Sequence, residues 1–153
     1  MDYEVKVIPE QKLAVINCKT PIQDLEIFLN ILMEWVETEE IKADGDPFIV
    51  YFSPRHEVNQ GDVVYDVSIP VKDDPDETDR IRVVDMIENK VLAAKHYGSP
   101  DNIMDTYAEL VEIAQANHYD IIGSPKEVLV KNFHNCDDEN DFVTEIQFPI
   151  IEM

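Results

Sequence analysis

Polar and apolar side chains alternate in the last predicted strand, residues 142–150. Successive side chains of a strand point to opposite faces, so Glu145 and Gln147 share one face of this strand. The opposite face is apolar throughout and consists of Ile146, Phe148 and Ile150. A carboxylate attracts an organic cation electrostatically, and an aromatic ring beside it adds a cation–π contact worth about 0.5–2 kcal/mol. The face that holds Glu145 therefore has part of the chemistry that a lipophilic cation requires.

The same alternation selects residues on the other predicted strands. In residues 127–131 we expect the two valines, at 128 and 130, to point inward, which leaves Glu127 and Leu129 on the open face. In residues 48–52 we expect the two phenylalanines and the valine to point inward, which leaves Tyr51 on the open face. Asn17 and Tyr97 suit the same face of two earlier strands, and Asp66 occupies the position of Glu145 in an internal repeat described below. The predicted open-face set comprises Glu145, Glu127, Tyr51, Asn17, Tyr97, Leu129, Gln147 and Asp66.

Other chemistry is poorly represented. The chain lacks the Gly-rich nucleotide-binding signatures, the Gly-x-Ser-x-Gly hydrolase motif and the His-Glu-x-x-His metal motif. Cys18 and Cys136 are too far apart for a metal-spaced pair, and His134 with Cys136 in an acidic loop makes a poor zinc site. His96 has no partner acid or nucleophile in its pattern, which favours a structural role. We expect no cofactor, no metal and no catalytic residue, and favour a binding protein over an enzyme.

The charge balance narrows the choice of partners. The 153 residues include 33 Asp and Glu against 12 Lys and Arg, which gives a net charge of −21. The negative electrostatic field of such a protein repels phosphate backbones and anionic lipids, so we expect neither direct nucleic-acid binding nor membrane binding. It attracts a cationic ligand or a basic protein partner, although a soluble acidic protein without such partners has the same composition. With no signal-peptide pattern and no run approaching about 18 apolar residues, a cytoplasmic location is expected.

An internal repeat organises the chain. Lys12 aligns with Lys90, and the register then holds for about forty residues without a gap. The recurring landmarks are Gly45 with Gly123, Pro47 with Pro125 and, after one insertion, Pro70 with Pro149. We therefore predict a single domain over residues 1–153, composed of one repeat at about 3–72, a charged linker at about 73–80 and a second repeat at about 81–153.

Each repeat is predicted to contain two strands, a helix and two further strands. In the first repeat the strands are residues 3–8, 13–19, 48–52 and 63–71, and the helix runs from Thr20 to about Ile41. In the second repeat the strands are residues 81–86, 91–97, 127–131 and 142–150, and the helix covers about 101–117. The fold class is thus α+β, with two pseudo-symmetric ββαββ repeats whose antiparallel sheets carry helices on one face.

The order of these motifs resembles the GyrI-like family, also described as the AraC-type effector-binding domain. The motifs that carry the resemblance are His96-Tyr97-Gly98, Tyr107, Gly123-Ser124-Pro125, Glu127-Val128 and Thr144-Glu145-Ile146-Gln147-Phe148-Pro149. Each is short, and their common order over the whole chain makes the match specific. Pro100 and Leu129 depart from the family pattern, which often has aromatic residues there, so the site is less cage-like and catalysis less favoured.

The resemblance implies a ligand cleft between the two halves, lined by the open-face set. Family members commonly act as sensors for lipophilic cations in transcription regulators. We therefore expect a stand-alone protein that binds a small lipophilic cation, in multidrug sensing, sequestration or transcription regulation. Glu145, helped by Glu127 and Tyr51, is expected to attract the positive charge.

Two alternatives stay open at the level of sequence, because the family also includes small hydrolases and a gyrase-inhibitory protein. A hydrolase would use Glu145 to activate water, and an acidic inhibitor would bind a DNA-handling enzyme such as gyrase through its charge. Glu127 and Glu145 can also be solvated side chains, or can pair with Lys95. The natural ligand and the oligomeric state do not follow from the sequence.

Overall fold

A computed structural model describes residues 1–133 and 135–152. The contacts between Cα atoms divide the chain into two compact units. One unit comprises residues 10–87, and we call it the Asp66 unit. The other comprises residues 1–9 and 88–153, and we call it the Glu145 unit.

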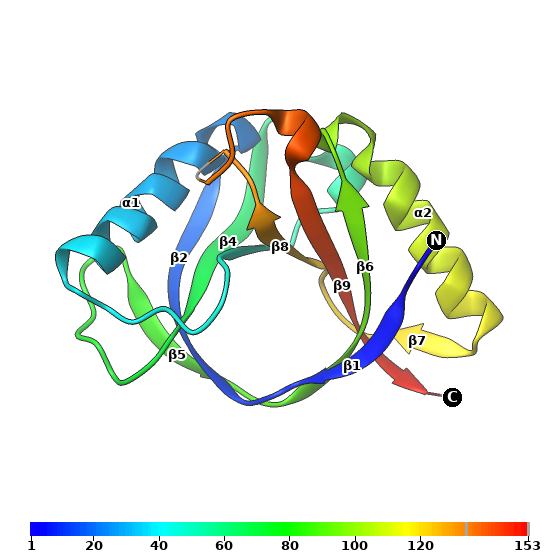
Figure 1. Cartoon of the computed structure of the whole chain (residues 1–153), viewed down its shortest axis with the longest axis horizontal. Helices are drawn as coiled ribbons and strands as arrows, with labels where there is room; N and C mark the ends of the chain where they lie inside the picture. The colour runs from blue at the N-terminus through cyan, green and yellow to red at the C-terminus, as the bar shows by residue number, and fades with distance from the viewer. Residues whose placement is uncertain (134, 153) are drawn as a thin grey trace. The chain divides into compact units, whose positions relative to one another are not determined.

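The Asp66 unit is an antiparallel sheet with one helix. Its strands lie in the order β3-β4-β2-β5 and have the bounds β2 (Gln11–Pro21), β3 (Phe48–Tyr51), β4 (Asp62–Val71) and β5 (Arg82–Met86). The helix α1 (Leu25–Thr38) follows a 3-10 turn at Ile22–Asp24 and covers one face of the sheet (Figure 1). It ends before the predicted Ile41, because Glu40 adopts a left-handed φ of 53°.

The Glu145 unit has the same design. Its strands lie in the order β1-β6-β9-β8 and have the bounds β1 (Glu4–Ile8), β6 (Asn89–Tyr97), β8 (Lys126–Lys131) and β9 (Val143–Glu152). The helix α2 (Ile103–Ala116) follows a 3-10 turn at Pro100–Asn102. A short strand that the sequence analysis missed, β7 (Tyr119–Ile121), pairs with the end of β9. Three residues are too few to show an alternation.

The first strand of each predicted repeat pairs with a strand of the other repeat. β1 pairs with β6, and β5 pairs with β2. The connections Pro9-Glu10 and Ile87-Glu88 contain none of the Gly or Asn residues that close a two-residue hairpin, so the chain runs on instead of folding back. The two strand orders, β5-β2-β4-β3 and β1-β6-β9-β8, correspond position by position, which is consistent with an internal duplication.

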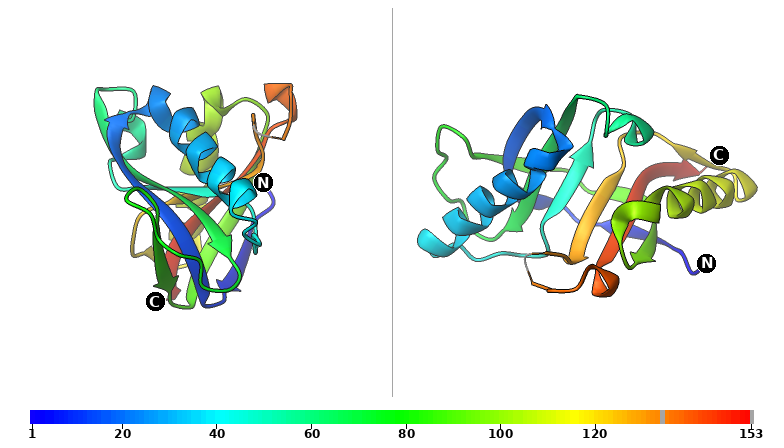
Figure 2. Two further views of the ribbon diagram at one scale, coloured as in Figure 1. Left: turned by 90° about the vertical axis from the view of Figure 1, so that its left-hand side faces the viewer. Right: turned by 90° about the horizontal axis from the view of Figure 1, so that it is seen from above.

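Each helix lies over one face of its own sheet, as Figure 2 shows from two further directions, and the residues that they bury between them are mainly apolar. In the Asp66 unit, Leu29 and Leu32 of α1 are fully buried. In the Glu145 unit, Tyr107 of α2 packs with Ile146 and Phe148 of β9, and the Tyr107 and Phe148 rings meet edge to face at 5.6 Å between centroids. This packing confirms the α+β class, and within residues 1–133 and 135–152 no helix covers the opposite face of either sheet.

The Gly and Pro landmarks of the repeat contact each other in each unit. A Cβ atom added to Gly45 would lie 3.3 Å from Pro70 Cγ, and one added to Gly123 would lie 3.1 Å from Pro149 Cγ. Both distances are shorter than the carbon–carbon optimum of about 3.5–4.0 Å. The two units therefore share the same close approach between a loop and a long strand, and this approach favours glycine.

Candidate functional site

The strand register places several predicted residues on the helix-free face of the Glu145 unit. Glu145 of β9 lies opposite Lys95 of β6, and Gln147 lies opposite Ala93. Tyr97 follows Lys95 by two positions and shares its face, with 70 % of its surface exposed. Glu145, Gln147 and Tyr97 therefore lie on the face that the alternation predicts.

Glu145 is nearly buried and has two partners within its unit. Lys6 Nζ of β1 lies 2.8 Å from Glu145 Oε2, and Gln147 Nε2 donates a hydrogen bond to the same oxygen at 2.6 Å. Burial favours a higher pKa for Glu145, but the Lys6 ammonium and the Gln147 amide outweigh it and lower the pKa. The negative charge of Glu145 is therefore already compensated inside the protein. The sequence analysis missed Lys6, because it did not pair β1 with β6.

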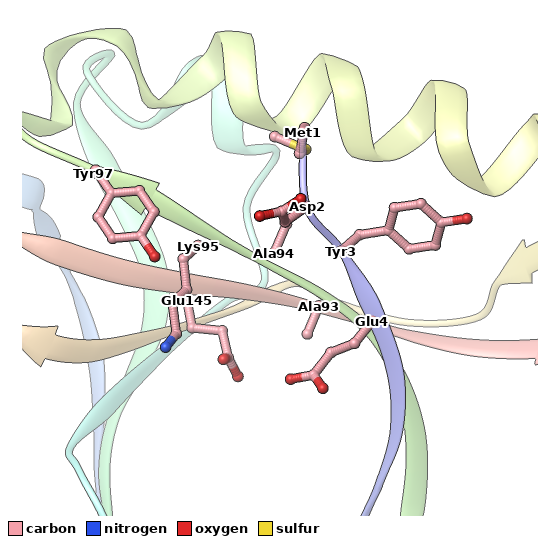
Figure 3. Close-up of a pocket in the computed structure, with 9 residues that line it drawn as sticks. All are labelled: Met1, Asp2, Tyr3, Glu4, Ala93, Ala94, Lys95, Tyr97 and Glu145. Atoms are coloured by element: carbon pink, nitrogen blue, oxygen red, sulfur yellow. The ribbon is translucent and has the colours of Figure 1, made fainter.

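A pocket of about 440 Å³ lies beside Glu145, and we call it the Glu145 pocket. Figure 3 shows Lys95 and Glu145 in its middle, with Tyr97 at one end and Tyr3 at the other. The N-terminal segment, residues 1–4, supplies part of the lining. The volume falls in the range of about 300–1,000 Å³ that small-molecule sites occupy. The pocket thus combines aromatic rings with charges of both signs.

The side-chain amide of Gln147 is only partly hydrogen-bonded within the described residues. Its side chain is buried, and among the described residues its Oε1 accepts no hydrogen bond. Lys126 of β8 lies opposite Gln147 in the register, and burial lowers the pKa of its ammonium to about 8. Buried polar atoms are normally hydrogen-bonded, so Gln147 Oε1 is an exception inside this sheet, and it lies outside the lining of the Glu145 pocket.

The Asp66 unit has a pocket of about 300 Å³ on the equivalent face, which we call the Asp66 pocket. Its apolar walls are Leu13, Val15, Phe48, Val50, Val84 and Met86. Asn17 Nδ2 donates a hydrogen bond to Asp66 Oδ1 at 2.6 Å. Burial raises the pKa of Asp66, and the Asn17 hydrogen bond opposes this rise only in part. Asn17 and Asp66 therefore lie together, on the face predicted for them.

The prediction for β8 is wrong, because this strand presents its other face. Glu127 and Leu129 lie on the side that faces α2, and Val128 lies opposite Glu145 instead. Glu127 is 4 % exposed and accepts a hydrogen bond from Tyr107 Oη of α2 at 2.5 Å. A carboxylate can occupy a core face only where donors satisfy it, and the Tyr107 hydroxyl is such a donor. Glu127 and Leu129 thus leave the open-face set.

The prediction for β3 is also wrong, because this strand too presents the face opposite to the expected one. Tyr51 is buried on the helix-facing side, where its ring lies 6.4 Å from that of Tyr65 between centroids. The guanidinium carbon of Arg55 lies 4.7 Å from the Tyr51 ring centroid. Phe48 and Val50, expected inward, line the Asp66 pocket. All four residues of β3 are apolar or aromatic, so alternation alone does not identify the buried face.

The remaining candidate groups have structural partners or no cluster. His96 Nδ1 lies 2.7 Å from Thr106 Oγ1 and Nε2 lies 2.9 Å from the Ser99 carbonyl oxygen, so both ring nitrogens are used within the fold. Within residues 1–133 and 135–152, no three His, Cys, Asp or Glu side chains gather to hold a metal ion. His134 lies outside the described residues. In the same part of the chain, no helix combines the length and apolar character needed to cross a membrane.

Two helix-free sheet faces, each with a carboxylate beside a pocket, define an α+β small-molecule-binding domain. The chain belongs to the GyrI-like family of small-molecule-binding domains, and the match covers residues 1–151. A search of curated proteins finds no match.

Solved structures share this fold at low sequence identity. The EcmrR C-terminal domain is 19 % identical, with a TM-score of 0.87 over 99 % of this chain and 98 % of that chain. EcmrR in its DNA complex is 20 % identical with the same TM-score over 99 % of this chain, which spans 58 % of that longer chain. SAV2435 bound to tetraphenylphosphonium is 12 % identical, with a TM-score of 0.63 over 99 % of this chain and 94 % of that chain. A hydrolase encoded by lin2189 from Listeria innocua is 12 % identical, with a TM-score of 0.68 over 97 % of this chain and 91 % of that chain.

Proposed function

We propose that this domain binds small lipophilic cations on the helix-free faces of its sheets and serves to sense or sequester them. One observation carries the proposal. Equivalent positions of β4 and β9 hold Asp66 and Glu145, and each carboxylate adjoins a pocket with apolar or aromatic walls. The net charge of −21 adds long-range attraction for cations and repulsion of anions.

Two of the similar structures support the proposal. SAV2435 binds tetraphenylphosphonium, a lipophilic cation, on the same fold. The EcmrR C-terminal domain is part of a protein that binds DNA, which supports a role in transcription regulation through a partner or a further domain. At 12–20 % identity only the fold is shared, so the preference for cations rests on the pockets of this chain.

The geometry favours binding over hydrolysis at Glu145. A carboxylate that activates water works best when its pKa is raised toward neutral pH. Lys6 and Gln147 lower the pKa of Glu145 against the effect of its burial. Pro100 also stands at a position where the family pattern often carries an aromatic residue.

A thermal-shift titration with tetraphenylphosphonium tests the proposal, with triphenylphosphine oxide as a neutral control of related shape. At one hundred times its Kd, a ligand stabilises the fold by about 2.7 kcal/mol, which for this length raises Tm by about 5–11 °C. We expect this shift for the cation, a clearly smaller one for the neutral compound, and a weaker cation effect at high salt. Equal shifts for both compounds, or none for either, would refute a cation-binding function, and a basic protein that co-purifies would then favour the inhibitor alternative.

A further inference from the structure

The two carboxylates differ in how their charge is compensated. Glu145 contacts an ammonium, Lys6 Nζ, at 2.8 Å. Asp66 contacts an amide, Asn17 Nδ2, and among the described residues no Lys, Arg or His side chain forms an ion pair with it. Glu145 therefore has an ion-pair partner within its unit, whereas the half-buried Asp66 has none in the part of the chain that the structure describes.

The charged residues around the Asp66 pocket do not supply Asp66 with an ion-pair partner among the described residues. Arg82 and Asp85 of β5 line the pocket at its exposed edge. Asp85 is paired with Lys12 Nζ at 3.2 Å, and Lys12 also lies 3.3 Å from Asp74. Lys12 is thus shared between two acidic groups at the surface. Arg82 is exposed, and among the described residues it forms no ion pair with Asp66, so water screens its charge and the charge of Asp66 is left to an incoming ligand.

We infer that Asp66, and not Glu145, receives the positive charge of the ligand, in a site formed by the Asp66 pocket. This inference deepens the proposed function and rests on it. The ligand class is a monovalent organic cation whose charge is delocalised or shielded by apolar groups, because the walls around Asp66 are apolar. Phe48 supplies a ring and Met86 a polarisable thioether at these walls.

Electrostatics explains the choice of site. A cation that approached Glu145 would meet the Lys6 ammonium and would have to displace it or tolerate its repulsion. A cation that approaches Asp66 meets a carboxylate whose burial disfavours its charged form, and the cation relieves that penalty. Asn17 engages Oδ1, and within the described chain no hydrogen bond or ion pair engages Oδ2, so this oxygen can face the ligand.

Three charge-neutralising variants test the inference with tetraphenylphosphonium in calorimetric titrations. Asp66→Asn keeps the shape of the side chain and should weaken binding about tenfold or more, as expected for the loss of a charge-assisted contact. Glu145→Gln should change the Kd by less than about threefold, because Lys6 already compensates that charge. Asp62→Asn is the matched control, since it removes one negative charge from the exposed start of the same strand, β4, outside the lining of the Asp66 pocket, and it should stay within about threefold.

The outcomes separate this inference from the proposed function. If the parent protein binds the cation and Asp66→Asn retains that affinity while Glu145→Gln loses it, the inference is wrong and the proposed function stands. If the parent protein shows no preference for the cation, the proposed function itself fails. Should Asp66→Asn not fold, amide chemical shifts of the parent protein decide the question. The cation should perturb residues 13–17 and 66–68, and perturbation confined to residues 93–97 and 145–147 would overturn the inference.

Discussion

Replacing Lys6 with Met tests the internal charge compensation of Glu145. Methionine keeps much of the apolar stem of lysine and removes the ammonium that lies 2.8 Å from Glu145 Oε2. The Gln147 hydrogen bond to Glu145 does not involve Lys6. The change also removes the contact of Lys6 Nζ with Glu4 Oε1 at 3.4 Å, but Glu4 is exposed and such pairs contribute little, so most of the effect reports on Glu145. We expect a folded but less stable protein.

The burial of the two side chains sets the expected magnitude. Removing one partner of a fully buried ion pair destabilises a protein by about 3–5 kcal/mol. The side chain of Glu145 is 10 % exposed but that of Lys6 is 33 % exposed, so water screens part of the interaction. We therefore expect a loss of about 2 kcal/mol at pH 7, which corresponds to about 4–8 °C in Tm for a chain of this length.

A double-mutant cycle with Glu145→Gln measures the pair directly by urea unfolding. The double variant should be more stable than the sum of the single effects predicts, with a coupling of about 1–2 kcal/mol. The pH dependence has a defined sign, because the pKa of Glu145 is lower in the folded protein. The stabilisation is present above the ordinary carboxyl pKa and is lost as the pH falls through the folded value, so the parent and Lys6→Met should converge in acid.

Two results would contradict this reasoning. Single effects that add within about 0.5 kcal/mol would mean that Lys6 and Glu145 are energetically independent. A stability difference between the parent and Lys6→Met that stays constant from pH 7 to acid would mean that the lost contribution does not depend on the ionised carboxylate.

Three further predictions follow from other contacts. Tyr107→Phe should lower the free energy of unfolding by about 1–3 kcal/mol in urea titrations, because the buried Glu127 carboxylate loses a donor at 2.5 Å, and an unchanged midpoint would argue against that hydrogen bond. Gly123→Ala should lower stability by about 1–3 kcal/mol, since its Cβ would lie 3.1 Å from Pro149 Cγ, and an unchanged Tm would show that the loop shifts without penalty. Burial, with a contribution from Asp66, raises the pKa of the Cys18 thiol to about 11. Its reaction with a disulfide reagent should therefore accelerate about tenfold per pH unit up to that value, and a plateau near pH 9 would contradict the burial.

The sequence predicted the fold class and the faces of the long strands correctly. β9 alternates apolar and polar residues over enough positions to identify the face that carries Glu145, and the register of the repeat extended that assignment to Asp66 of β4. The recurrence of Gly45 with Gly123 marked a contact that the structure shows in both units. These features depend on local periodicity and on the size of one side chain, which are properties of the sequence itself.

The tertiary structure decided the orientation of the short strands and the partners of the charged groups. In β3 every residue can be buried, and in β8 a carboxylate is buried because α2 brings Tyr107 Oη to Glu127. Lys6 reaches Glu145 because β1 pairs with β6, although these residues lie far apart in the chain. The periodicity of a sequence indicates which face of a strand or helix is apolar. The ion pairs and hydrogen bonds of a charged group or a hydroxyl depend on which residues the packing places beside it. The partners of Glu127 and Glu145 therefore follow only from the arrangement of the strands and of α2.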